Sequence, residues 1–104
     1  MQVVSVVNGI FFKSKIEAVV RRFGTNIFCS TVDEVHSAEP MMVIVDLEHP
    51  NALEILQTFG SRVVAFGPHL RVDLLAVAKE FGAKAYPRSA FFNELDTILW
   101  QRSG

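Results

Sequence analysis

Residues 41–47, MMVIVDL, decide the fold that the sequence predicts. This is the most hydrophobic run of the chain, and its one charged residue, Asp46, lies near its end. A strand that is apolar on both faces is typical of the centre of a parallel sheet covered by helices on both sides. We therefore predict a central strand here, with Asp46 close to its carboxyl end.

Four further apolar runs alternate with helical patterns on either side of this strand. The expected strands are residues 2–7, 26–30, 62–66 and 83–86. Between and after them, apolar side chains recur at helical spacing, within residues 12–23, 53–59, 74–81 and 91–99. Thr31 and Glu34 have capping-box spacing, but Pro40 follows so soon that the second helix is expected to be short or missing. Ser89 is expected to cap the last helix.

Strands that alternate with helices at short spacing form β-α-β crossovers, and hence a parallel sheet. Five such units predict an α/β, flavodoxin-like, three-layer sandwich with strand order 2-1-3-4-5. The 104 residues fit a single domain, 1–104. Neither GxGxxG nor GxxxxGK[ST] occurs in the sequence, so nucleotide binding through those two motifs is not expected.

The composition argues against several classes of partner. Ten basic residues face eleven acidic ones and no basic run exceeds Arg21-Arg22, so no nucleic acid is expected to bind. No apolar stretch approaches the roughly 20 residues that span a bilayer, so no membrane association is expected. The N-terminal MQVVSVVNG lacks the basic region of a signal peptide. The single Cys29 cannot form an internal disulfide, which favours a reduced, cytoplasmic location.

The carboxyl ends of the predicted strands are the places to look for chemistry, because open α/β sheets bind ligands there. The polar or turn-forming residues at these ends are Asn8, Gly9, Asp46, Glu48, His49, Gly67, His69, Arg88 and Ser89. No nucleophile lies at motif spacing from a base, so we predict no catalytic residue and no enzymatic activity.

Residues 41–50, MMVIVDLEHP, resemble the third strand of a response-regulator receiver domain. In that family an apolar strand ends in the phosphoacceptor Asp and a Pro often follows four residues later, as Asp46 and Pro50 do here. Residues 66–91, FGPHLRVDLLAVAKEFGAKAYPRSAF, resemble the receiver's fourth strand, fourth helix and fifth strand. The resemblance covers essentially the whole chain. It implies two-component signal transduction, or a phosphorelay, with Asp46 at the phosphoacceptor position.

The sequence departs from the receiver pattern at the positions that carry the chemistry. Receivers place an acidic pair after the first strand to hold Mg²⁺, where this sequence has Asn8-Gly9. They place a hydroxyl residue after the fourth strand, where this sequence has Gly67. They place a Lys after the fifth strand, where the nearest cation here is the displaced Arg88. Phosphorylation of a carboxylate needs a divalent cation. A site made of Asp46, the Asn8 amide and the Glu48 carbonyl would hold Mg²⁺ weakly. The departures imply a non-enzymatic pseudo-receiver without a cofactor.

Two residues of this crevice leave alternatives open. Asp46 is either a surviving acceptor, which would make the chain an atypical phosphorylated receiver, or a strand-end carboxylate that caps backbone N–H groups. Arg88 either pairs with Asp46 or points to solvent.

His49, His69 and Asp46 are weak candidates for a metal site. With Arg88, the same residues would alternatively serve a small-ligand binder or an enzyme.

The resemblance also implies a site for a protein partner. Receivers dimerise and dock targets through the face made by the fourth helix, fifth strand and fifth helix, and Tyr86 stands where the family often carries a switch aromatic. Phe91 and Phe92 project about 100° apart on a helix, so they cannot both face the same way. Together with Trp100, these residues mark that face as the expected site of a protein partner or a homodimer.

Overall fold

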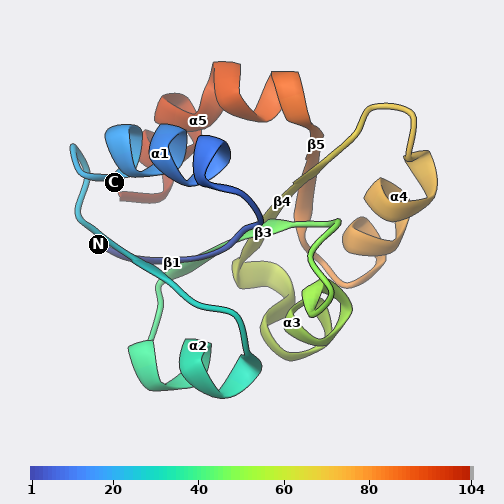
Figure 1. Cartoon of the computed structure of the whole chain (residues 1–104), viewed down its shortest axis with the longest axis horizontal. Helices are drawn as coiled ribbons and strands as arrows, with labels where there is room; N and C mark the ends of the chain where they lie inside the picture. The colour runs from blue at the N-terminus through green and yellow to red at the C-terminus, as the bar shows by residue number, and fades with distance from the viewer. Residues whose placement is uncertain (104) are drawn as a thin grey trace.

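The computed structural model describes residues 1–103 as a single parallel sheet with helices on both faces (Figure 1). The strands are β1 (Gln2–Val6), β2 (Thr25–Phe28), β3 (Met42–Asp46), β4 (Val63–Gly67) and β5 (Lys84–Pro87). Their order is β2-β1-β3-β4-β5, and every neighbouring pair is parallel. The predicted flavodoxin-like, three-layer α/β fold is confirmed.

Five α-helices cover this sheet. They are α1 (Ile10–Val20), α2 (Val32–Ala38), α3 (Ala52–Phe59), α4 (Val72–Glu80) and α5 (Arg88–Ser103), with a short 3-10 turn η1 (Gly60–Arg62) after α3. Figure 1 shows α1 and α5 on one face and α2, α3 and α4 on the other. Within the described chain, no helix has the length and apolar character needed to cross a membrane.

The central strand β3 holds the two layers together. All five of its residues are buried, which confirms the prediction from residues 41–47. Val43 and Val45 pack with the core beneath α2, α3 and α4, whereas Met42 and Ile44 pack with the core beneath α1 and α5. Successive side chains of a strand point to opposite faces, so one strand supplies both cores.

The second helix is short but present. Thr31 and Glu34 form the predicted capping box: the Glu34 N–H donates to Thr31 Oγ1 at 3.2 Å, and the Thr31 N–H donates to Glu34 Oε1 at 3.1 Å. Val35 is the buried residue that anchors α2 to the sheet. Glu39 ends the helix with a left-handed φ of 50°, one residue before Pro40.

Two expectations about element boundaries are wrong. Ser89 does not cap α5 from outside, because the helix begins at Arg88, directly after β5 ends at Pro87. No residue is left for a loop, and Ser89 therefore lies in the first helical turn. Cys29 is buried but follows β2, instead of lying within it as the predicted strand over residues 26–30 requires.

Phe91 and Trp100, both on α5, provide a test of this packing. Phe91 is fully buried and stacks on Phe66 of β4, with ring centroids 4.7 Å apart, whereas Trp100 on the same helix is 71% exposed. We predict that Phe91→Ala lowers the free energy of unfolding by about 3–5 kcal/mol. Trp100→Ala should change it by less than about 1 kcal/mol. Urea denaturation followed by circular dichroism measures both, and similar losses would contradict the packing described.

Candidate functional site

Asp46 closes the floor of the crevice at the carboxyl ends of the strands. It is the last residue of β3 and only 2% exposed. Its Oδ1 accepts a hydrogen bond from the Glu48 N–H at 3.0 Å. The carboxylate thus stabilises the turn that leaves β3, which is the capping arrangement considered for a strand-end acid.

Arg88 lies at the rim of this crevice and binds Glu48. Its Nη2 donates to Glu48 Oε1 at 2.8 Å, and the two side chains are 33% and 46% exposed. The alternatives of a pair with Asp46 and of a free, solvent-directed side chain are therefore both wrong. The guanidinium carbon lies 4.7 Å from the centre of the Phe12 ring, which supports the side chain from α1.

Glu48 is the residue on which the crevice contacts converge. Besides Asp46 and Arg88, Asn8 reaches it: the Asn8 Nδ2 donates to the Glu48 main-chain carbonyl at 3.4 Å. These contacts join residues that follow β1, β3 and β5. The loop after the central strand is therefore tied to the residues that follow β1, which is its neighbour in the sheet, and β5, which is two strands away.

The turn after β1 is not shaped for an acidic pair. Gly9 has a φ of 82° and a ψ of 139°, a conformation that only glycine adopts without strain. The Glu48 carbonyl, which was expected as a weak Mg²⁺ ligand, already accepts from Asn8. The Glu48 carboxylate is neutralised by Arg88. These residues do not fit the oxygen-rich, anionic surroundings that Mg²⁺ requires.

The space around Gly67 does not explain why this position has no hydroxyl side chain. Gly67 is the buried last residue of β4. A Cβ at this position would meet the Leu47 side chain at 3.5 Å, an ordinary van der Waals distance. A serine or threonine would therefore be accommodated where the receiver pattern has one.

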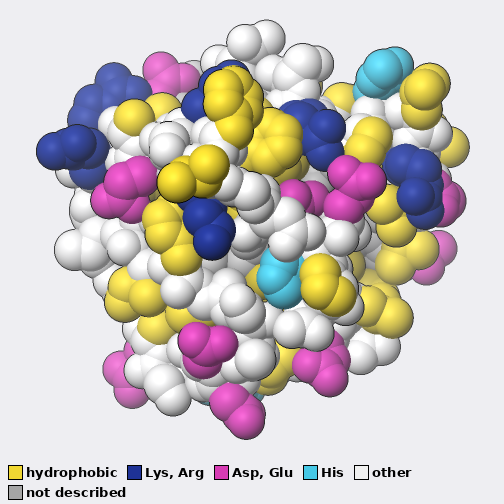
Figure 2. Space-filling view, viewed as in Figure 1, with side chains coloured by type: hydrophobic (Ala, Val, Ile, Leu, Met, Phe, Trp, Pro, Cys, Tyr) yellow, Lys and Arg dark blue, Asp and Glu magenta, His cyan; other side chains and the backbone are white. Residues whose placement is uncertain are grey.

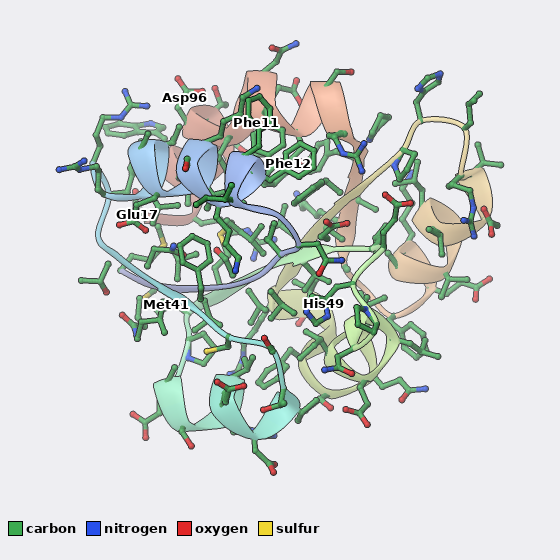
Figure 3. The ribbon with its side chains drawn as sticks, viewed as in Figure 1. Phe11, Phe12, Glu17, Met41, His49 and Asp96 are labelled. Carbon is green, nitrogen blue, oxygen red and sulfur yellow. The ribbon has the colours of Figure 1, made fainter. Side chains whose placement is uncertain are left out.

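The two candidate histidines lie in different places. His49 lies in the turn between β3 and α3, where its Nδ1 accepts from the Asn51 N–H at 3.0 Å (Figure 3). His69 is exposed in the loop before α4. Within residues 1–103, no three His, Cys, Asp or Glu side chains gather closely enough to hold a metal ion. The weak candidate set of Asp46, His49 and His69 is therefore not brought together.

The surroundings of His49 in this turn shift its pKa. Burial lowers the pKa of His49 below its ordinary value of 6.5, because desolvation penalises the charged imidazolium. The nearby Asp46 carboxylate raises this pKa and the Lys13 ammonium lowers it, both more weakly than burial. A neutral ring also keeps Nδ1 free to accept from the Asn51 N–H.

This lowered pKa predicts a pH dependence of stability. Between the folded and unfolded pKa values the unfolded state binds more protons, so the contribution of His49 is present above pH 6.5 and is lost as the pH falls through the folded-state pKa. From about pH 7.5 to about pH 5.5, the wild type should lose more unfolding free energy than His49→Asn. Asn can accept the same hydrogen bond but does not titrate. Equal losses in urea denaturation would contradict the assignment.

A cleft of about 630 Å³ lies beside this crevice, between the N-terminal ends of α1 and α5. It is lined by Phe11, Phe12, Lys15, Pro68, His69, Arg88, Ser89, Phe92 and Asn93. Figure 3 shows Phe11 and Phe12 projecting from the first turn of α1 on the side of α5. Phe11, Phe12 and Lys15 were not among the expected site residues; the signal in the sequence was the apolar triplet Ile10-Phe11-Phe12 that follows Asn8-Gly9.

The four residues expected to bind a partner do not share one surface. Phe91 is buried, so it is unable to touch a partner in this fold. Tyr86 and Phe92 are half-buried against the core beneath α1 and α5. Trp100 is exposed, but it lies beside Arg22 and Phe23 near the end of α1, away from α4. The apolar exposure near α4 comes from other residues: Leu70, Val72, Val77 and Phe81.

Comparison with models of known protein families gives no match, and comparison with curated proteins gives none at the significance required.

Proposed function

We propose that this chain is a receiver-like signalling module that binds a protein partner and is not phosphorylated on Asp46 by the Mg²⁺-dependent route. The observation that carries the proposal is the position of Glu48. Its N–H donates to the Asp46 carboxylate and its own carboxylate pairs with Arg88, while Asp46 is only 2% exposed, which argues against the entry of a phosphoryl group.

Phosphoryl transfer to Asp46 lacks the groups that it needs. A metal ion must neutralise the phosphoryl oxygens while the acceptor approaches in line. Asp46 is nearly inaccessible, Asn8 and Gly9 supply no carboxylate, and Glu48 is already paired. Gly67 has no hydroxyl to bind a phosphoryl oxygen. The crevice thus keeps the acceptor position without the electrostatic stabilisation that makes it reactive.

A module whose state is not changed by phosphorylation presents the same binding surface to its partner at all times. A ligand shifts a protein between two states only if it binds them with different affinity, and the phosphoryl group that would do so has no site here. We place the protein partner on the face of α4, β5 and α5. Val77 of α4 and Phe81, the residue that follows this helix, are four positions apart and both partly exposed, as expected of an apolar contact strip.

Treatment with acetyl phosphate and Mg²⁺ tests the absence of phosphorylation. We predict that the intact mass of the wild type stays unchanged, as does that of Asp46→Asn, while an ordinary receiver domain in the same tube gains a phosphoryl group. A phosphoryl adduct on the wild type that is absent from Asp46→Asn would establish the atypical phosphorylated receiver instead.

Neighbouring positions on α4 test the docking face. We predict that Val77→Lys abolishes capture of the protein's partners from a lysate of its source cells, because a charge interrupts the apolar strip. Ala76→Lys adds the same charge on the same helix, about 100° around its axis, and should leave capture intact. Loss in the Ala76 variant with retention in the Val77 variant would place the partner elsewhere.

A further inference from the structure

The cleft between α1 and α5 carries positive charge without a carboxylate among its lining residues. Lys15 supplies a cation with no paired carboxylate in the described part of the chain, and Arg88, whose Nη2 pairs with Glu48, supplies a second cation. Figure 2 shows basic and hydrophobic side chains interleaved over the ends of these helices. Among the described residues Lys15 forms no ion pair, and its Nζ instead lies 4.7 Å from the centre of the Phe11 ring and 5.3 Å from that of Phe92. The rings hold this cation in place and leave its charge available to an anion.

Hydrogen-bond donors surround the same space. The cleft is lined by Ser89 and Asn93, which offer a hydroxyl and a carboxamide. The first N–H groups of α5 have no intrahelical acceptors, and its first turn contains no acidic residue to compete for them. The Arg88 Nε is buried and has no hydrogen-bond partner. Cations together with helix N–H groups suit a phosphate.

Aromatic rings form the other part of the cleft wall. Phe12 and Phe92 are stacked, with centroids 5.5 Å apart and planes 14° apart, and Phe11 is 65% exposed beside them. Flat rings stack on such faces with little regard to their substituents. The cleft volume of about 630 Å³ lies in the usual range for small organic ligands.

We propose that this cleft binds a small phosphate that carries an aromatic ring, of the size of a nucleoside monophosphate. The phosphate lies between Lys15, Arg88 and the start of α5, and the ring lies against the exposed Phe11. Asp46 and Glu48 do not line the cleft. The proposal therefore goes beyond the protein-binding function and does not depend on it.

Titration of ¹⁵N-labelled protein with the four ribonucleoside monophosphates tests this proposal. Binding of at least one of them should shift the amide signals of Phe11, Lys15, Ser89 and Phe92. The uncharged nucleoside lacks the phosphate and so tests the contribution of the phosphate to binding. Inorganic phosphate lacks the ring and so tests the contribution of the ring. We expect the nucleoside and inorganic phosphate each to bind at least about tenfold more weakly than the nucleotide, since each keeps only part of the contacts.

Exposed residues allow matched variants. Lys15→Gln should weaken the nucleotide about tenfold, whereas Lys79→Gln, which removes the same charge from α4, should bind like the wild type. Phe11→Ala should weaken the nucleotide and leave inorganic phosphate unchanged. Neither Lys15 nor Phe11 takes part in the Glu48 contacts, so failure here is distinct from failure of the proposed function.

Three results would overturn the proposal. The first is that no amide signal of a cleft residue shifts with any of the nucleotides up to about 10 mM, because a dissociation constant above that concentration is weaker than ordinary specific binding. The second is equal affinity for nucleoside and nucleotide, which would remove the role of charge. The third is equal nucleotide affinity in Lys15→Gln and Lys79→Gln, which would show only a general attraction of anions.

Discussion

Burial of β3 on both faces is the constraint on which the rest of the structure depends. Alternate residues of this strand, from Met42 to Val45, enter the two hydrophobic cores, so helices must cover both sides of the sheet. A sheet enclosed in this way has polar groups free for chemistry only where its strands end. Asp46 is the first residue of the strand that can meet this edge, and the crevice is built around it.

The contacts at that edge are individually weak, yet they fix a geometry. A partly exposed ion pair such as Arg88–Glu48 adds only about 0–1 kcal/mol to stability. The ion pair matters because it fixes the position of the loop after β3 relative to the start of α5. Phe12 of α1 supports the guanidinium of Arg88. Arg88 therefore belongs both to the crevice, through its pair with Glu48, and to the lining of the cleft.

The fold was predictable from the sequence because its signals are local. Apolar runs with helical stretches between them set the strand order, and Thr31 with Glu34 marked a short helix. The site was predictable only in part. The partner of Arg88 depends on where α5 begins, and the cleft depends on two helix ends that meet in space. Which of Phe91 and Phe92 is buried, and which way Trp100 faces, likewise follow from helix rotation, which periodicity determines only to within a residue or two.

We propose that Asp46 does not act as a phosphorylation switch. Amide spectra of ¹⁵N-labelled protein, recorded with Mg²⁺ before and after addition of the phosphoryl mimic beryllofluoride, test it most directly. The account predicts unchanged signals from Asp46 and Glu48 through the end of β4 to α4. Saturable shifts that begin at Asp46, extend into α4 and vanish in Asp46→Asn would contradict it, because they would show that the acceptor still drives a change of state.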